Sequence, residues 1–450
     1  MAAYKQNQVK YEMLRQKHNL FIYDSYKIER DSQNTKITYK YIMDDITFQP
    51  TWTFSNSYFK RGIDEEFFEN LVFNLGMVEL VSYWKAACPK NVQILCGELS
   101  SRQVAFFKKL YFNGLGEFFY TNGINADFDD FMDIKSEGKK HKFSPLDDDF
   151  SGSLIPVGGG KDSIVTLELL KEEKEKNACY IVNPRGASLD SCYTAGFEDE
   201  KIIKAYRTID PELLRLNSLG YLNGHTPFSA MLAFSCLIFA YIQGKKYIVL
   251  SNESSANESN VLDTNINHQY SKGIEFENDF REYVKNYITG KIIYFSLLRP
   301  LSEWQIVKEF SKHKKYFNVF KSCNVGSKKD VWCANCPKCL YVYIMLSAHL
   351  DREEVERIFG KNMLDDFSLK DTFDGLICDF LDKPFECVGT KGEINLALRR
   401  TISKYKGKLP KLLEYYKENY MDEDVINYDL YFDEAHNVPK EFLKYLGKVE

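Results

Sequence analysis

Apolar and polar residues alternate repeatedly in the first third of the chain. The alternating apolar positions are Ile37, Tyr39, Tyr41 and Met43, then Ile46 and Phe48, then Trp52 and Phe54. A period of two places every second side chain on one face of a strand, whereas residues 67–84 have helical spacing. We predict a small β-meander with helices packed on it, followed by a polar connector over residues 127–149.

From residue 154 onward, short apolar runs of β type alternate with helical stretches. These runs cover residues 154–157, 178–182, 247–250 and 292–295. Strands separated by helices indicate an α/β fold with a doubly wound parallel sheet, in which ligands bind beyond the carboxyl ends of the strands. We therefore divide the chain into an N-terminal α+β domain (1–150), a sheet domain (151–322) and a helical C-terminal region (323–450).

Composition and charge narrow the classes of function. The chain has 450 residues, 44% of them hydrophobic, and a formal net charge of −5, which gives no broad attraction to nucleic acid. The basic residues within 399–411 are interpreted as a solvated helix face. Residues 1–17 are too polar for a signal peptide, and the apolar run 228–242 is too short to span a membrane. We expect a soluble cytoplasmic protein with no membrane or nucleic-acid partner; the sequence leaves its oligomeric state open.

Three consecutive glycines, Gly158, Gly159 and Gly160, join a predicted strand to a predicted helix. Glycine allows the backbone to approach an anion closely, and the helix N-terminus adds a partial positive charge. Asp162 stands where the loop of kinases and GTPases needs Ser or Thr. The sequence therefore predicts a phosphate cradle of another kind; the alternative is a turn that needs glycine for packing alone.

The segment 158–163 resembles the Ser-Gly-Gly-x-Asp-Ser loop of the ATP-pyrophosphatase (PP-loop) family, with Gly158 at the usual serine position. The resemblance implies cleavage of ATP to AMP and pyrophosphate, with the substrate passing through an adenylate. Arg299 precedes a predicted helix that opens with a Ser302–Gln305 capping box, which puts it at a strand-to-helix junction facing the same cleft. A buried ion pair is the alternative role for Arg299.

Four cysteines are crowded into one short segment: Cys323, Cys333, Cys336 and Cys339. Thiolates at two-residue spacings can close a tetrahedral zinc site that leaves no position open for a substrate water. The chain has eleven cysteines in all, few for its length, so metal thiolates in a reducing compartment are favoured over disulfides. We expect structural Zn²⁺; the alternatives are an iron–sulfur cluster and free or redox-active thiols.

Four further segments distinguish one family from the other PP-loop enzymes. They are Ser251-Asn252-Glu253-Ser254-Ser255-Ala256, Asn267-His268-Gln269-Tyr270-Ser271-Lys272 with Glu275-Phe276-Glu277, residues 295–303, and Lys383-Pro384-Phe385-Glu386-Cys387-Val388-Gly389. Together they are similar to the UDP-N-acetylmuramoyl-L-alanyl-L-glutamate epimerase family (MurL). The resemblance implies an enzyme of peptidoglycan precursor synthesis that inverts the terminal L-glutamate of UDP-MurNAc-L-Ala-L-Glu, using ATP and Mg²⁺.

The resemblance and the strand positions suggest roles for residues on the nucleotide side. Those expected to bind phosphates or nucleoside are Gly158, Gly159, Gly160, Ser163, Asn183, Ser251 and Asn252. Lys161 and Arg299 would counter the charge of the departing pyrophosphate, and Asp162 and Glu253 would hold Mg²⁺ directly or through water.

Five residues are candidates for moving the glutamate Cα proton: His268, Glu275, Glu277, His225 and Cys387. Imidazole, carboxyl and thiol groups carry protons near neutral pH when their pKa values are modestly shifted. The alternatives are structural hydrogen bonding for the histidines and simple burial for Cys387.

The substrate, a UDP-linked muramoyl dipeptide, is bulky, so the N-terminal domain is expected to help orient it. Tyr39, Tyr41 and Trp52 are possible exposed contacts, with core packing as the alternative.

Two other functions stay open on the sequence. One is an adenylating enzyme that forms an amide, nitrile or thio product, as in 7-cyano-7-deazaguanine synthase, where a PP-loop is also followed by four cysteines. The other is a nucleotide-sensing module that binds ATP without cleaving it.

Overall fold

One sheet runs through both halves of the chain in the computed structural model, which describes residues 6–146, 150–421 and 426–447. The strand order is β11-β10-β7-β8-β9-β4-β2-β1-β5-β6, with β3 paired to β2. The strands are β1 (Leu20–Arg30), β2 (Asn34–Met43), β3 (Ile46–Phe48), β4 (Thr51–Ser55), β5 (Asn91–Ile94), β6 (Asp133–Ser136), β7 (Ser153–Pro156), β8 (Ala178–Val182), β9 (Ile202–Arg207), β10 (Tyr247–Leu250) and β11 (Ile293–Ser296).

Most of the strand pairings are parallel. The five strands from β11 to β9 pair in parallel, as do β1 with β5 and β5 with β6, while β1, β2, β3, β4 and β9 meet in antiparallel pairs. The predicted α/β class is confirmed. Strand β9 was not predicted, and its antiparallel pairing with β4, Trp52 opposite Arg207, joins the two halves. The predicted connector contains β6, so that interpretation was wrong for residues 133–136.

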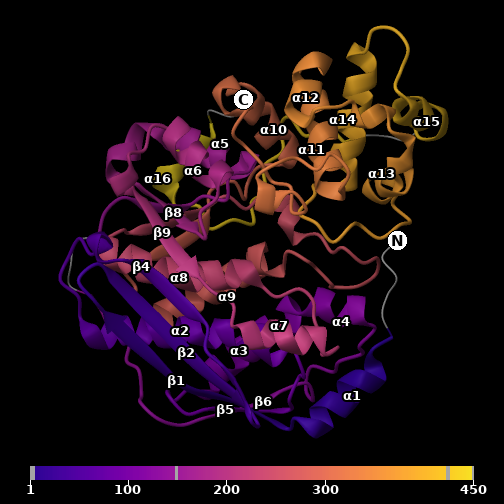
Figure 1. Ribbon diagram of the computed structural model, residues 1–450. Coiled ribbons are helices and arrows are strands. Elements are labelled where there is room, and N and C mark those ends of the chain that lie inside the picture. Colours follow the sequence, from indigo (N-terminus) through magenta and orange to yellow (C-terminus); the bar gives the residue numbers. More distant parts are fainter. Residues whose placement is uncertain (1–5, 147–149, 422–425, 448–450) are drawn as a thin grey trace.

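Helices cover both faces of the sheet and build the C-terminal region. The α-helices are α1 (Gln8–Lys17), α2 (Glu65–Trp84), α3 (Ser101–Gly114), α4 (Gly116–Asn122), α5 (Lys161–Leu169), α6 (Gly186–Thr194), α7 (Pro211–Ser218), α8 (Phe228–Gln243), α9 (Ile274–Tyr287), α10 (Glu303–Ser311), α11 (Pro337–Ser347), α12 (Arg352–Phe359), α13 (Lys370–Ile377), α14 (Lys391–Lys404), α15 (Lys411–Asn419) and α16 (Lys440–Leu446). Figure 1 shows α11 to α15 gathered at one end of the molecule, opposite α1, β5 and β6.

Two apolar cores lie on opposite sides of the parallel strands. Successive side chains of a strand point to opposite faces, so Leu154 of β7 joins one core and Ile155 the other. The first core lies between the sheet and α2, α3, α8 and α9; the second lies under α5, α10, α11 and α14. Burial on both faces explains why β7, β8 and β10 are almost continuously apolar.

The aromatic residues of the N-terminal strands are core residues. Tyr39, Tyr41 and Trp52 are at most 1% exposed, and the two tyrosine hydroxyls donate hydrogen bonds to backbone carbonyls of α2 at 3.1 and 2.6 Å. The packing alternative is confirmed for these three residues, and they are not available to a substrate.

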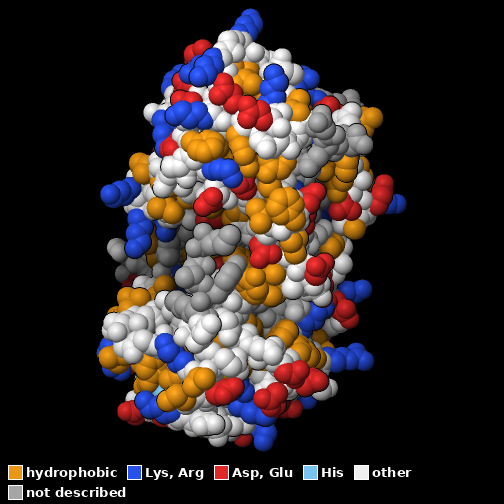
Figure 2. Space-filling model, turned by 90° about the vertical axis from the view of Figure 1, so that its right-hand side faces the viewer, with side chains coloured by type: hydrophobic (Ala, Val, Ile, Leu, Met, Phe, Trp, Pro, Cys, Tyr) orange, Lys and Arg blue, Asp and Glu red, His pale blue; other side chains and the backbone are white. Residues whose placement is uncertain are grey.

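The molecular surface carries charges of both signs. On the face shown in Figure 2, Lys and Arg side chains are interspersed with Asp and Glu, with no wide field of one sign. In the described ranges, no helix combines the length and the apolar character that a membrane crossing requires.

Candidate active site

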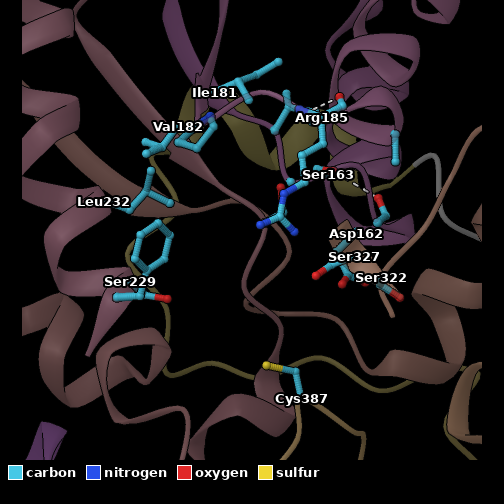
Figure 3. A pocket seen from close by; sticks show the side chains of 18 of the residues that line it. Asp162, Ser163, Ile181, Val182, Arg185, Ser229, Leu232, Ser322, Ser327 and Cys387 are labelled. Carbon is cyan, nitrogen blue, oxygen red and sulfur yellow. Dashed lines mark hydrogen bonds between the residues drawn. The ribbon is translucent and has the colours of Figure 1, made fainter. Parts of the chain in front are cut away.

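A cavity of about 580 Å³ opens at the carboxyl ends of β7, β8 and β10, where the sheet topology predicts a ligand site. In Figure 3, Asp162, Ser163, Ser322 and Ser327 lie toward one side, and Ile181, Val182, Leu232 and Ser229 toward the other. The Cys387 thiol lies at a third point of the cavity wall, and the Arg185 side chain extends into the space between these three parts of the wall. The cavity thus joins a polar end, an apolar end and a thiol.

The glycine loop, residues 158–160, forms the polar end together with the start of α5. Gly159 has φ +84°, and a Cβ placed there would lie 2.6 Å from the Ala187 carbonyl carbon in α6. The N-cap of α5, Gly160, has no side-chain hydrogen bond, so first-turn N–H groups stay available at the cavity. Ser163 Oγ donates a hydrogen bond to Gly160 O at 3.0 Å. The loop has the geometry expected of an anion cradle.

Lys161 lies behind the loop among three carboxylates. Its ammonium group pairs with Asp162 and Glu303, and its side chain is 2% exposed. Oxygens of Asp162, Glu253 and Glu303 lie within 4.8 Å of one another. Burial raises the pKa of Glu303 to about 8, against the opposing effect of Lys161. The predicted pair Asp162 and Glu253 is therefore together, with Glu303 as a third member that the sequence did not reveal.

The apolar end of the cavity is formed by β8, α8 and the end of β10. Asn183 borders it at φ +50°, but its amide group is engaged by β9: Nδ2 donates to Arg207 O at 3.0 Å, and Oδ1 accepts from Arg207 N at 2.8 Å. Asn252 Nδ2 donates to Ser296 Oγ at 3.0 Å. Ser251 lines the cavity, and its buried Oγ has no hydrogen-bond partner within the described part of the chain.

Cys387 lies in a loop beside two lysines. Lys272 Nζ is 2.9 Å from Cys387 Sγ, and Lys338 Nζ bonds to the Cys387 carbonyl oxygen. Burial opposes a charged thiolate, but Lys272, His268 and Lys338 outweigh it and lower the pKa of Cys387 to about 6. We call Cys387, Lys272 and His268 the thiol site. At neutral pH its sulfur is a thiolate that can accept a proton.

His268 is bound by a carboxylate from the N-terminal region. Its Nδ1 lies 2.5 Å from Glu117 Oε2, and Cys387 is close enough to the ring to stabilise its charged form. Burial disfavours the imidazolium, but Cys387 and Glu117 raise the pKa of His268 to about 9. His225 packs on His268 with ring centroids 4.5 Å apart, and burial together with the charge of His268 lowers its pKa to about 4. The two predicted histidines are adjacent, one charged and one neutral.

Among the predicted residues, Glu275, Glu277 and Arg299 do not line the cavity, and neither do His225, Glu253 and His268. Glu275 is an exposed residue of α9 that pairs with Lys109 at 2.8 Å. Glu277, on the other side of α9, is buried and lies 3.5 Å from Arg299. Arg299 is fully buried and donates to the carbonyl oxygens of Glu253 and Lys272, so it ties two segments of the site together from behind. The capping box of Ser302 with Gln305 is present as predicted.

The four predicted cysteines converge. Their sulfurs lie within 4.8 Å of one another, with Cys323–Cys336 at 3.8 Å, Cys333–Cys339 at 3.7 Å and Cys336–Cys339 at 3.5 Å. Zinc–sulfur bonds of about 2.3 Å place the sulfurs of a tetrahedron about 3.8 Å apart. The cysteine cluster thus fits a tetrahedral metal ion.

The loop that enters the cysteine cluster also supports the glycine loop. Lys321 N donates to Gly159 O at 2.9 Å, and Asp330 Oδ1 accepts from Ala187 N, at the start of α6, at 3.1 Å. The cluster therefore fixes one wall of the cavity.

Sequence reasoning placed Arg185 among the polar residues that follow the strands but gave it no role, and it did not select Lys272, Lys338, Glu117 or Glu303 as site residues. Lys272 and Lys338 each lay inside a segment already singled out, so a search for cations beside the chosen residues would have found them. Glu117 is 151 positions from His268, and a single sequence carries no signal for that contact.

Comparisons with known proteins cover most of the chain. Sequence profiles described as the MurL N-terminal domain and the MurL C-terminal domain match residues 12–297 and 319–425. A protein of Xanthomonas oryzae pv. oryzae is 33% identical over 344 residues, which are 74% of this chain and 75% of that protein. One of Salinispora tropica is 34% identical over 333 residues, 72% of this chain and 71% of that protein. Both are named UDP-N-acetyl-alpha-D-muramoyl-L-alanyl-L-glutamate epimerase.

Proposed function

Because this chain belongs to the MurL family, we propose that it inverts the terminal L-glutamate of UDP-MurNAc-L-Ala-L-Glu to D-glutamate, using ATP to activate the glutamate α-carboxyl. The observation that carries the proposal is the shared cavity, which has the glycine loop at one point of its wall and the Cys387 thiolate at another. A nucleotide and a proton acceptor can therefore reach the same carboxyl group and its neighbouring Cα.

Activation of the carboxyl explains the need for ATP. A free α-carboxylate resists loss of the Cα proton, because the carbanion would place a second negative charge beside the first. Adenylation removes the carboxylate charge and lets the carbanion delocalise as an enolate. In PP-loop chemistry the carboxylate attacks the α-phosphorus of ATP and pyrophosphate leaves, which forms the adenylate; after inversion, water hydrolyses the adenylate to AMP and the free carboxylate. The glycine loop with the N-terminus of α5 would bind the phosphates.

The two ends of the cavity suggest how ATP binds. The phosphates would lie at the glycine loop and Ser163, with Arg185 extending toward them as a cation. The base would lie against Ile181 and Leu232, beside Ser251. Asp162, Glu253 and Glu303 offer the oxygen donors that Mg²⁺ prefers. Bound there, Mg²⁺ would neutralise phosphate charge.

Proton transfer would be the work of the thiol site. We assign Cys387 as the group that exchanges a proton with Cα on one face, since it lines the cavity as a thiolate. Lys272 and Lys338 beside it would stabilise the negative charge of the enolate. Inversion requires that the proton returns to the opposite face, so a second group must face Cys387 across the substrate.

The cysteine cluster would hold structural Zn²⁺. Four thiolates complete the preferred coordination of the ion and leave no position for a water, so the metal takes no part in proton transfer. Its role would be to fix the loop of residues 321–330 against the glycine loop and α6.

The test is an incubation with ATP, Mg²⁺ and UDP-MurNAc-L-Ala-L-Glu in deuterated water. We expect substrate-dependent AMP, D-glutamate and deuterium at Cα. A Cys387→Ala variant should still form AMP, while inversion falls by roughly 10²–10⁴-fold because one general base is lost. AMP without inversion in the wild-type protein would redirect the proposal to an amide- or nitrile-forming enzyme. ATP binding without any AMP would indicate a nucleotide sensor.

A further inference from the structure

The short helix α4 lies against both loops that form the thiol site. Glu117 and Tyr120 are three residues apart in α4 and therefore share one face of the helix. Glu117 contacts the loop that carries His268, and Tyr120 contacts the loop that carries Cys387. This part of the N-terminal region thus organises side chains that are far away in sequence.

The contacts of Glu117 centre on one oxygen atom. Oε2 lies 2.5 Å from His268 Nδ1 and 3.4 Å from His225 Nδ1. Glu117 is largely shielded, with 16% of its side chain exposed, as is His268 with the same value. A carboxylate on one ring nitrogen of a histidine fixes the orientation of the ring and favours its protonated form.

Tyr120 secures the second loop. Its hydroxyl donates a hydrogen bond to Asp382 Oδ2 at 3.0 Å, and its ring packs on Phe385 with centroids 5.7 Å apart. The other oxygen of Asp382 accepts from Leu262 N at 3.1 Å, which connects the Cys387 loop to the His268 loop directly.

We propose that Glu117 is a positioning residue for proton transfer: it holds His268 against Cys387, so the N-terminal region completes the thiol site. Glu117 acts through His268 and does not touch the reacting atoms. The inference rests on the proposed function for its meaning in catalysis, but the contacts that it invokes are testable without substrate.

The charged groups around Cys387 and His268 determine how the loss of the Glu117 charge should change their pKa values. Cys387 faces Lys272, Lys338 and His268, while His268 faces Cys387, Glu117, His225 and Glu386. Without the Glu117 carboxylate, the buried imidazolium loses a partner and releases its proton at lower pH. The thiolate then loses one of its three cations, and the pKa of the thiol rises toward its usual value.

The experiment compares Glu117→Gln with wild type by following alkylation of Cys387 with iodoacetamide across pH, read by mass spectrometry of the Cys387 peptide. Since only the thiolate reacts, the midpoint reports the thiol pKa. We expect an upward shift of about one pH unit, or about tenfold slower alkylation at pH 5. Glu117→Asp, which keeps the charge, should recover part of the shift. Glu275→Gln, which changes an exposed carboxylate outside the cavity, is the matched control.

Steady-state kinetics of the same variant distinguish a positioning role of Glu117 from a defect in folding. In Glu117→Gln, kcat for inversion should fall at least tenfold while the KM for ATP stays within about twofold, since the glycine loop is untouched. If Glu117→Gln does not fold, Tyr120→Phe gives the second test, with loss of inversion and unchanged AMP formation expected.

An alkylation profile of folded Glu117→Gln that superimposes on wild type would overturn the inference. The two proposals also fail separately. If the wild-type protein forms no D-glutamate, the proposed function fails, whereas the alkylation shift still decides whether Glu117 controls the thiol.

Discussion

Replacing Gly159 with alanine tests whether the glycine loop is the nucleotide site. The residue has φ +84°, in the left-handed region, where a side chain costs about 1–2 kcal/mol. The added Cβ would also lie 2.6 Å from Ala187 C and 2.7 Å from Ser188 N, both backbone atoms of α6. Overpacking of this kind adds about 1–3 kcal/mol. The total of about 2–5 kcal/mol must displace the loop or destabilise the fold.

Gly158→Ala is the matched control. A Cβ at Gly158 meets no atom within 4 Å among the described residues, and Gly158 is not among the glycines with positive φ. The chemical change is identical and one position away. Its melting temperature should therefore stay close to that of wild type, since surface-like substitutions usually change stability by less than about 0.5 kcal/mol.

Isothermal titration with ATP and Mg²⁺ measures the loss of binding free energy in each variant, and thermal unfolding measures the loss of stability. We expect ATP binding by Gly159→Ala to weaken about thirtyfold if all of the lower estimate falls on the loop, because about 1.4 kcal/mol is tenfold in affinity. If Gly159→Ala retained both the affinity and the melting temperature of wild type, the close approach between the glycine loop and α6 would be refuted.

Three further outcomes are expected. Cys336→Ser should lower the metal content of the purified protein below one ion per chain, as measured by elemental analysis. It should also destabilise the protein by more than about 4 kcal/mol, as measured by thermal unfolding. An unchanged melting temperature would exclude a structural metal. The rate of inversion should rise about tenfold per pH unit up to about pH 6 and then become constant. The reason is that the pKa of Cys387 is lowered to about 6 and the thiolate is the reactive form. A rate that does not change from pH 4 to 6 would exclude Cys387 as the base. His268→Gln should reduce kcat for inversion at least tenfold with AMP formation retained, whereas Glu275→Gln should match wild type, and equal losses in both would contradict the placement of Glu275 on the surface.

The sequence was sufficient where local chemistry decides the structure. The alternation at 37–43 gave β2, the glycines 158–160 gave the turn between β7 and α5, and Ser302 with Gln305 gave the start of α10. Each depends on side-chain periodicity, backbone freedom or capping within a few residues. The cysteine cluster was predictable for the same reason, since three of its four ligands lie within seven residues.

Helix geometry separates two of the residues that were predicted as candidates for proton transfer. Glu275 and Glu277 were both candidates, but residues two apart on an α-helix point about 200° away from each other. At most one of them could face inward, and the structure turns Glu277 toward Arg299 and Glu275 toward solvent. Which face of α9 is buried depended on its packing against the sheet.

Contacts between segments that are far apart in the chain could not be predicted from the sequence. Strand β9 pairs with β4 across more than 150 residues, and Glu117 meets His268 across 151. Propensity and periodicity describe what one segment can form, but which segments meet depends on the burial of all apolar faces together. The sequence by itself therefore determined the glycine turn between β7 and α5, the cysteine cluster and the α/β class, while only the tertiary structure brought Glu117, His268, Lys272 and Cys387 into one thiol-centred arrangement.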